Sequence, residues 1–198
     1  HYRPYVPSGM EKENAAKLYR ETQERVMTEI VKKTYGLLGR NISYSFSKGY
    51  FTDKFTSGNF SGCTYENFDI QEIAAFKQIT QDRTDVKVLE WGIPYKEGVG
   101  PFLNKLSKKA AKIGAVNTIK VTKKGKLKGY NTDYYGFKRT LEPLLQSHHK
   151  NALILGTGGA SKGVAFALDE LGVSYTFISR ETKENAMAYK HIDATTFN

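Results

Sequence analysis

Hydrophobic side chains recur at two different spacings along this chain. Between residues 10 and 33 they follow helical spacing with charges between them, which predicts one amphipathic helix. From Tyr35 onward, short apolar runs alternate with helical patterns, and this succession is typical of an α/β architecture. Residues 1–9 contain two prolines and no periodicity, so we expect them to be irregular.

The elements after Tyr35 follow from the same patterns. The predicted strands are 35–39, 63–70, 85–91, a hairpin of 116–122 and 126–130 that turns at Lys124-Gly125, 152–155 and 175–178. The predicted helices are 47–55 capped by Ser47, 71–78, 96–113, 133–146, and one that begins near Gly159 and ends at Gly172.

The composition limits the classes of protein that the chain can represent. Its 198 residues are enough for one large domain or two small ones, and 39% of them are hydrophobic. No apolar run approaches the roughly 20 residues that span a bilayer, and the N-terminus has no signal-peptide pattern. Cys63 is the only cysteine, which excludes an intrachain disulfide and a cysteine metal cluster. We expect a soluble, cytoplasmic protein without a metal or a membrane partner.

The positive charge is unevenly distributed. The net charge is +10, and nine lysines but no acidic residue lie between Glu97 and Asp133. Such a stretch can attract nucleic acid or small anions, although most of these lysines are expected to form a solvated surface. No nucleic-acid-binding motif accompanies them, so we predict a small-molecule ligand and no nucleic-acid partner.

A glycine-rich turn is the clearest functional signal. Residues 156–161 read Gly-Thr-Gly-Gly-Ala-Ser, directly after the apolar run 152–155 and before a helical pattern. Gly156 permits a tight bend, Gly158 lets the backbone approach a phosphate, and the helix that begins near Gly159 directs free N–H groups at the anion. Ser161 stands at the third glycine position of the usual dinucleotide fingerprint. The alternative is an ordinary tight turn between a strand and a helix.

The end of the next predicted strand indicates which dinucleotide is bound. Arg180 follows that strand, where this fold distinguishes NAD from NADP. An arginine suits a 2′-phosphate, whereas an acidic residue would bind a ribose 2′-hydroxyl. The adjacent Glu181 leaves NAD open, but NADP is favoured.

These observations divide the chain into three parts. Residues 1–33 form an N-terminal extension, residues 34–147 a first α/β domain, and residues 148–198 the start of a Rossmann-like domain. Only 18 residues follow Arg180 (198 minus 180), enough for a helix but hardly for both the third strand and the second half of such a domain. We therefore expect a truncated chain.

Four further stretches, together with the glycine turn, carry a resemblance to a known family. They are Ser45-Phe46-Ser47, Ile93-Pro94-Tyr95-Lys96-Glu97, Gly114-Ala115-Val116-Asn117-Thr118 and Gly129-Tyr130-Asn131-Thr132-Asp133. In order and spacing the chain resembles shikimate dehydrogenases over roughly residues 34–182. The resemblance implies a shikimate-binding α/β domain and a Rossmann-like NADP-binding domain in a monomer or homodimer. It implies reversible reduction of 3-dehydroshikimate to shikimate, within chorismate and aromatic amino acid biosynthesis.

The resemblance also implies roles for individual residues. Lys96 and Asp133 match the catalytic pair, Ser45 and Ser47 match serines that bind the substrate carboxylate, and Asn117 matches an asparagine that contacts ring hydroxyls. Two hydroxyls at i and i+2 in an extended loop can reach one anion. The cofactor-binding positions are Gly156, Thr157, Gly158, Gly159, Ala160, Ser179 and Arg180.

Each of these residues also has a purely structural interpretation. Lys96 can be a solvated lysine at a helix start, and Asp133 can be the N-cap of the helix that it precedes. The two serines can form a polar turn with a helix cap, and Asn117 can be a hydrogen-bonded asparagine at a strand edge.

The chain departs from the family pattern near the expected substrate. Glu90, Trp91 and Gly92 stand where the family has Asn-Val-Thr, so Gly92 matches a substrate-binding position without offering a hydroxyl. The proline expected near Asn41 and the histidine expected at Tyr44 are missing too. These departures leave two alternatives open: a non-catalytic relative that binds a ligand or a partner, and an NAD-using quinate/shikimate dehydrogenase.

Overall fold

A computed structural model of the chain describes residues 13, 14, 17, 20, 21, 31–92, 98–193 and 196. The five described residues before residue 31 are helical, but the predicted helix does not continue to residue 33. Lys33 instead begins the first strand, because its N–H donates to the Gly62 carbonyl in a parallel ladder. The segment expected to be irregular, 1–9, lies outside the described residues. Among the helices described, none is long and apolar enough to cross a membrane.

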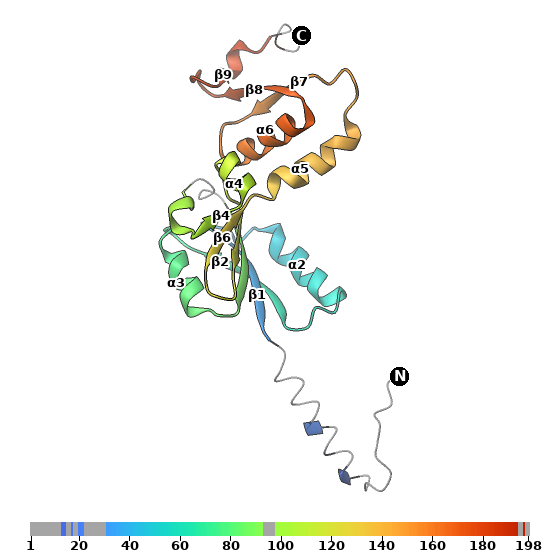
Figure 1. Cartoon of the computed structure of the whole chain (residues 1–198), viewed down its shortest axis with the longest axis vertical. Helices are drawn as coiled ribbons and strands as arrows, with labels where there is room; N and C mark the ends of the chain where they lie inside the picture. Colours follow the sequence, from blue (N-terminus) through green and yellow to red (C-terminus); the bar gives the residue numbers. More distant parts are fainter. Residues whose placement is uncertain are drawn as a thin grey trace.

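A six-stranded sheet forms the first lobe (Figure 1). Its strands in spatial order are β2 (Cys63–Asp69), β1 (Lys33–Gly39), β3 (Val86–Trp91), β5 (Thr118–Val121), β6 (Leu127–Tyr130) and β4 (Lys105–Leu106). β1 runs parallel to β2 and β3, whereas β5 is antiparallel to β3 and to β6. The hairpin predicted around Lys124-Gly125 is therefore confirmed.

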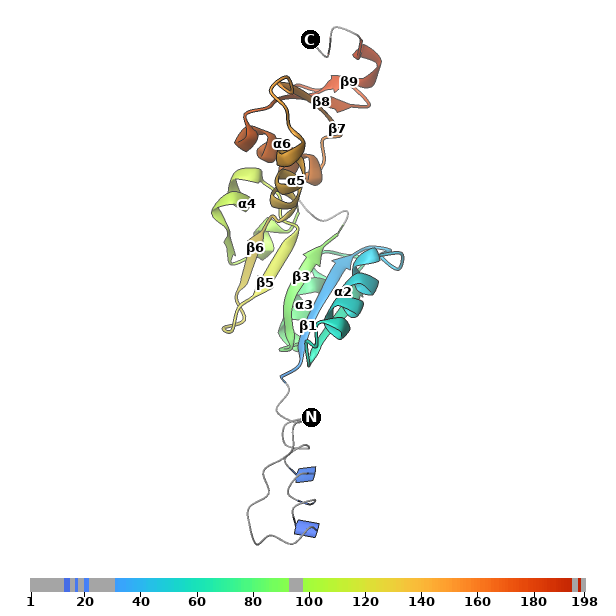
Figure 2. The ribbon, with the colours of Figure 1, turned by 90° about the vertical axis from the view of Figure 1, so that its right-hand side faces the viewer.

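Helices on both faces of this sheet enclose its core. α2 (Phe46–Ser57) and α3 (Ala75–Asp82) cover opposite faces (Figures 1 and 2). Phe76 of α3 is fully buried and meets the Trp91 ring edge to face, with the ring centroids 5.0 Å apart. Leu38, Leu89 and Ile119 from neighbouring strands complete this centre. Because burial on both faces fixes the register, the ends of the strands are held firmly.

Two predicted helices of the first lobe are wrong in extent. The described part of the segment 96–113 contains a 3₁₀ turn (Gly100–Phe102), the short strand β4 and the helix α4 (Lys108–Ile113). Pro101 interrupts the helical pattern, and α4 starts only after Ser107, whose hydroxyl accepts the Ala110 N–H at 3.1 Å. α3 begins at Ala75, four residues later than predicted.

The second lobe is a smaller parallel sheet with the order β7 (Asn151–Leu155), β8 (Ser174–Ser179) and β9 (Met187–Ala188). α6 (Gly159–Leu171) connects β7 to β8, which confirms the strand, glycine turn, helix and strand expected there. The residues after Arg180 form no α-helix within the described range; they form β9 and the 3₁₀ turn Tyr189–His191.

The helix α5 (Asp133–Leu141) links the two lobes. It ends at Leu141 rather than residue 146, where a 3₁₀ turn (Glu142–Leu144) containing Pro143 follows. Phe137 and Leu141 of α5 pack against the apolar cluster of Ile154 and Leu168. α5 and α6 lie between the two sheets in both views (Figures 1 and 2). The domain boundary expected at residue 148 stays a prediction; α5 packs with the elements that follow it.

Candidate functional site

Polar residues from four segments meet at one edge of the large sheet. Ser45 follows β1, Glu90 lies near the end of β3, Asn117 precedes β5 and Asp133 follows β6. Because β5 and β6 run antiparallel, the start of β5 and the end of β6 reach the same edge as the ends of β1 and β3. A cavity of about 560 Å³ opens there. Its described lining residues are Leu37, Ile42, Tyr44, Ser45, Phe46, Glu90, Trp91, Gly92, Asn117, Thr132 and Asp133.

The Asp133 carboxylate is oriented by Asn117. Asn117 Nδ2 donates to Asp133 Oδ1 at 2.7 Å, while Asn117 Oδ1 accepts the backbone N–H of Thr132 at 2.7 Å. Asp133 is the first residue of α5, and the capping hydrogen bond comes from the buried Asn131, whose Oδ1 accepts the Tyr134 N–H at 3.2 Å. The interpretation of Asp133 as the helix N-cap is therefore wrong, and its half-buried carboxylate faces the cavity.

The two predicted serines do not act as a pair. Ser45 lines the cavity and is the N-cap of α2, because its Oγ accepts the Ser47 N–H at 3.2 Å. The prediction that Ser47 caps this helix, and that both serines lie in an extended loop, is wrong. Ser47 is the second residue of α2 and is not among the described residues lining the cavity. Helical residues two apart do not face the same side.

The departures from the expected pattern fall inside the cavity. The Tyr65 hydroxyl donates to Glu90 Oε2 at 2.6 Å. Burial and this hydrogen bond hold the pKa of Tyr65 well above its usual value, so the phenol remains a donor. At Gly92, an added Cβ would lie 3.2 Å from the Leu38 carbonyl oxygen, to which the Gly92 N–H donates. A side chain at this position would therefore require the Leu38 carbonyl to move by a few tenths of an ångström.

Lys96, the second expected catalytic residue, lies outside the described residues, together with the rest of the segment 93–97. Its position relative to Asp133 therefore stays a prediction. Gly92, the last described residue before this segment, lines the cavity.

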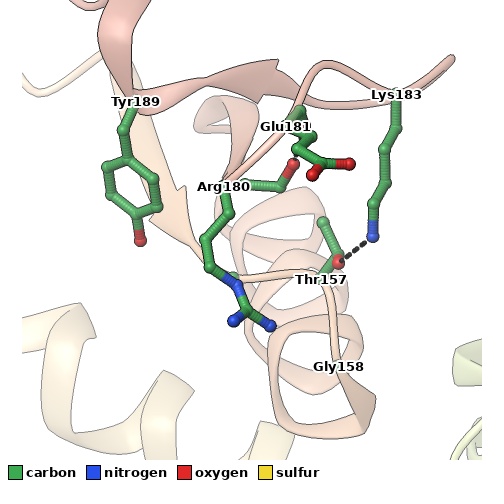
Figure 3. A pocket seen from close by; sticks show the side chains of 8 residues that line it. Thr157, Gly158, Arg180, Glu181, Lys183 and Tyr189 are labelled. Carbon is green, nitrogen blue, oxygen red and sulfur yellow. Dashed lines mark hydrogen bonds between the residues drawn. The ribbon is translucent and has the colours of Figure 1, made fainter.

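A second cavity, of about 630 Å³, lies at the glycine turn (Figure 3). Gly156 has φ +119°, a conformation that favours glycine, and an added Cβ at Gly158 would meet open space. Ser161, at the third glycine position, is buried and donates to the Gly158 carbonyl at 2.6 Å, which braces the turn. The predicted residues that line this cavity are Gly156, Thr157, Gly158, Ser179 and Arg180. Gly159 and Ala160 begin α6 and are not among its described lining residues.

The structure adds three lining residues that were not predicted for this cavity: Glu181, Lys183 and Tyr189. The Lys183 ammonium lies 3.5 Å from Thr157 Oγ1, and Arg180 extends toward the same turn (Figure 3). The Ser179 hydroxyl donates to the Glu181 carbonyl and so holds the start of this loop. The sequence gives only one indication of Lys183, a cation three residues after Arg180. The approach of Lys183 to Thr157 depends on the turn in which Lys183 pairs with Ala186, and the sequence pattern does not reveal that turn.

Close packing connects the two cavities. Gly163 of α6 is buried against the start of α5, and an added Cβ would lie 3.4 Å from Asn131 Oδ1 and 3.7 Å from Asp133 Cβ. The third glycine of the dinucleotide fingerprint usually permits close helix packing. Here Gly163, two residues after Ser161, permits the contact between α6 and α5.

Together, the fold and the two cavities define an α/β protein with a substrate-binding domain and a second, small parallel sheet. The pattern of the shikimate dehydrogenase substrate binding domain matches residues 37–119. A shikimate dehydrogenase (NADP(+)) from Caldanaerobacter subterraneus subsp. tengcongensis is 37% identical over 158 residues, which are 79% of this chain and 56% of that protein. The chain belongs to the shikimate dehydrogenase family.

Solved structures agree with this assignment. Shikimate dehydrogenase 1 from Peptoclostridium difficile is 31% identical with a TM-score of 0.70, over 81% of this chain and 63% of that one. Shikimate 5-dehydrogenase from Thermus thermophilus, solved with NADP(H) and shikimate, is 30% identical with a TM-score of 0.67, over 75% and 56% of the two chains. The present chain spans about half the length of the curated relatives that it matches.

Proposed function

We propose that the chain carries the substrate-binding part and the first dinucleotide-binding part of an NADP-dependent shikimate dehydrogenase. The reaction is the reversible reduction of 3-dehydroshikimate to shikimate. The observation that carries the proposal is the meeting of Asp133, Asn117 and Ser45 in one cavity, while a separate cavity lies at the glycine turn. The Thermus thermophilus relative was solved with both ligands, which supports a shared arrangement.

The glycine-turn cavity fits a phosphorylated dinucleotide. The turn at Gly156 and Gly158 leaves open space for a pyrophosphate, and the 13-residue helix α6 directs its first N–H groups toward it. Arg180 and Lys183 place two cations in the same cavity, which favours a 2′-phosphate and hence NADP. When bound, NADP supplies or accepts the hydride of the reaction.

We assign the proton transfer to Asp133 and Lys96. The Asn117 amide holds the Asp133 carboxylate in one orientation, where it accepts a hydrogen bond from the substrate hydroxyl. Lys96 donates a proton to the carbonyl oxygen during reduction and takes one from the hydroxyl in the reverse direction. Ser45 offers its hydroxyl proton to the substrate, since its oxygen already accepts the Ser47 N–H.

A non-catalytic relative that only binds a ligand is the second candidate. The observation that favours it is the Glu90 carboxylate in the cavity beside Gly92, which has no side chain to contribute. The oriented carboxylate of Asp133 opposes it, because a pure binding module does not require a carboxylate held in one orientation beside a reacting hydroxyl.

Titration calorimetry of the chain tests the proposal. We expect saturable binding of shikimate and of NADP+, with Asp133→Asn weakening only shikimate binding. In a protein that also holds the nicotinamide, Asp133→Asn should lower turnover by about 10²-fold or more. Asp82→Asn, an exposed change at the end of α3, is the matched control. Turnover unaffected by Asp133→Asn would favour the binding module.

A further inference from the structure

The loop between β1 and α2, residues 40–45, forms one wall of the cavity at the edge of the large sheet. Tyr44 and Ser45 line this cavity, as does Ile42, which is only 5% exposed. Ser45 is the residue of this loop to which the proposed function gives a role in binding. The restraints on the loop therefore determine whether the Ser45 hydroxyl is in place before a ligand arrives.

Asp69, the last residue of β2, binds the backbone of this loop with both of its carboxylate oxygens. Asp69 Oδ1 accepts the Asn41 N–H at 3.0 Å, and Asp69 Oδ2 accepts the Ile42 N–H at 3.3 Å. The parallel register pairs Asp69 with Gly39, the last residue of β1, so the carboxylate lies where the chain leaves the sheet. Hydrogen bonds from backbone N–H groups to a carboxylate are stronger than those between neutral groups. Two of them fix the direction of two successive N–H groups.

The backbone of Asn41 suits this contact. Its φ is +54°, in the left-handed region that asparagine tolerates better than most residues. The proline that the family pattern has near this position would have a φ of about −65° and no N–H to donate. The departure from the family pattern at Asn41 therefore accompanies a different way of holding the loop.

The restraint continues from Ile42 to Ser45. The Ile42 carbonyl accepts the Ser45 N–H at 3.0 Å and the side chain of Asn67 at 3.3 Å. Asn67 precedes Asp69 by two residues on β2, so the two side chains share one face of the strand. The end of β2 thus holds both the N–H and the carbonyl of Ile42, and that carbonyl holds the backbone of Ser45.

We propose that Asp69 is a positioning residue of this cavity: its carboxylate holds the loop 40–45 so that the Ser45 hydroxyl is presented to the ligand. This inference rests on the proposed function, which assigns Ser45 to the substrate. Asp69 is not among the described residues that line the cavity, and it acts through the backbone of the loop. Without this carboxylate the loop occupies other conformations as well, and the apparent affinity falls with the fraction of molecules in which Ser45 is in place.

Hydrogen exchange followed by NMR tests the contact in the free chain. Asp69→Ala removes both acceptors, so the amides of Asn41 and Ile42 should exchange about fivefold faster or more. The Ile70 amide, which donates to the Gly39 carbonyl at 2.9 Å, should keep its protection. An equal rise at all three amides would show a general loosening of the strand ends and would overturn the specific role of Asp69.

Calorimetry with shikimate tests the positioning role. Asp69→Ala should weaken shikimate binding about fivefold or more and leave NADP+ binding at the glycine turn unchanged. Asp69→Asn keeps one acceptor oxygen and should weaken shikimate binding less. Asp82→Ala, which removes an exposed carboxylate at the end of α3, is the matched control and should change neither affinity.

The outcomes separate this inference from the proposed function. Unchanged exchange at Asn41 and Ile42 would overturn the contact, whether or not shikimate binds. Faster exchange with an unchanged shikimate affinity would overturn the positioning role and leave the proposed function in place. If the parent chain binds no shikimate, the proposed function fails, and the role of Asp69 in it fails too. If Asp69→Ala does not fold, as judged by circular dichroism, Asp69→Asn serves for both measurements, and equality with the parent in both would overturn the proposal.

Discussion

A single asparagine, Asn117, connects three of the segments that form the cleft. Its side chain donates to Asp133 and accepts from the backbone of Thr132, and its backbone carbonyl accepts the Trp91 N–H at 2.6 Å. The carboxylate of Asp133 is thereby oriented without a ligand, which lowers the cost of arranging the site when substrate arrives.

We expect single residues also to determine which cofactor is preferred. In the proposed complex, Arg180→Ala removes a charge-assisted contact to the 2′-phosphate, so it should weaken NADP+ binding by about 1.5–3 kcal/mol while affecting NAD+ much less. Lys183→Ala should act in the same direction, because its ammonium lines the same cavity. The measurement is the ratio of the two affinities by calorimetry. Lys112→Ala, at an exposed position of α4, is the control. If neither Arg180→Ala nor Lys183→Ala changes the ratio, these two cations do not bind the 2′-phosphate.

At the scale of elements, the contact between α5 and α6 depends on a small residue at the position of Gly163. An added Cβ would make ordinary contact with Asn131 and Tyr134, whereas a branched side chain would not fit between the helices. We expect Gly163→Ala to be tolerated and Gly163→Val to destabilise the protein by about 1–3 kcal/mol and to weaken shikimate binding. Urea denaturation and calorimetry measure the two effects. Equal stability of the Ala and Val variants would contradict the close packing.

The opposite edge of the large sheet is held by an ionic network. Arg83 bonds Asp85 at 2.8 Å and Glu66 at 3.1 Å, and the buried Thr34 hydroxyl donates to Asp85. The hydrogen bonds from Arg83, and a smaller one from Thr34, hold the pKa of Asp85 well below its usual value. Ionised Asp85 therefore stabilises the folded state above about pH 4, and this contribution is lost as the pH falls further.

Replacing this carboxylate should reveal its pH dependence. Asp85→Asn should lower the free energy of unfolding by about 1.5–3 kcal/mol near neutral pH. The difference from the parent should shrink in acid, because the parent loses the same contribution there. Urea denaturation at several pH values measures this, with Asp82→Asn as the exposed control. A difference that stays constant down to about pH 2 would exclude the ionised form of Asp85 as its source.

The sequence was informative where one periodicity dominated. The strands with continuous apolar runs, the hairpin at Lys124-Gly125 and the glycine turn followed from local pattern, and the structure confirms them. The helix predicted over 96–113 is wrong because Pro101 and Ser107 interrupt it, and the spacing of the surrounding lysines does not reveal these interruptions. Capping by Ser45 rather than Ser47 depends on backbone geometry that spacing alone does not fix.

The site was harder to predict than the fold, because its contacts join residues that are distant in sequence. The structure brings Ser45, Asn117 and Asp133 to one cavity, whereas Ser47 does not line it and Lys96 lies outside the described residues. The contact of Tyr65 with Glu90 joins residues 25 apart in sequence and depends on the register of two strands that flank β1. Such a contact leaves no local pattern, so it could not be predicted from the sequence.

At the scale of the whole molecule, an ionic contact joins the two lobes. Glu170 of α6 accepts from Lys109 of α4 at 2.6 Å and from Lys138 of α5 at 3.0 Å. Lys109 also lies 4.7 Å from the centre of the Tyr134 ring. The hydrogen bond from Lys109, and a smaller contribution from that of Lys138, hold the pKa of Glu170 below its usual value.

Glu170→Gln should loosen the connection between the lobes, because the neutral amide attracts the two lysines less. Cysteines that replace Asp53 in α2 and Asp169 in α6 carry spin labels, and Cys63 is replaced by serine. The labels report the distance between the lobes. We expect a broader distance distribution in the variant, and in the parent at high salt. Glu142→Gln, which affects an ion pair within α5 and its following turn, is the control. An unchanged distribution would show that packing alone sets the arrangement.

The contact of Gly163 with the start of α5 has a thermodynamic consequence. α6 begins at the glycine turn, and its fifth residue, Gly163, adjoins Asn131 and Asp133. Under the proposed function, a dinucleotide that shifts α6 should therefore also shift the carboxylate that we assign to the substrate. Linkage then requires reciprocity: the factor by which dinucleotide changes the affinity for substrate equals the factor by which substrate changes the affinity for dinucleotide. We therefore expect the packing at Gly163 to give the two cavities a common free energy of coupling.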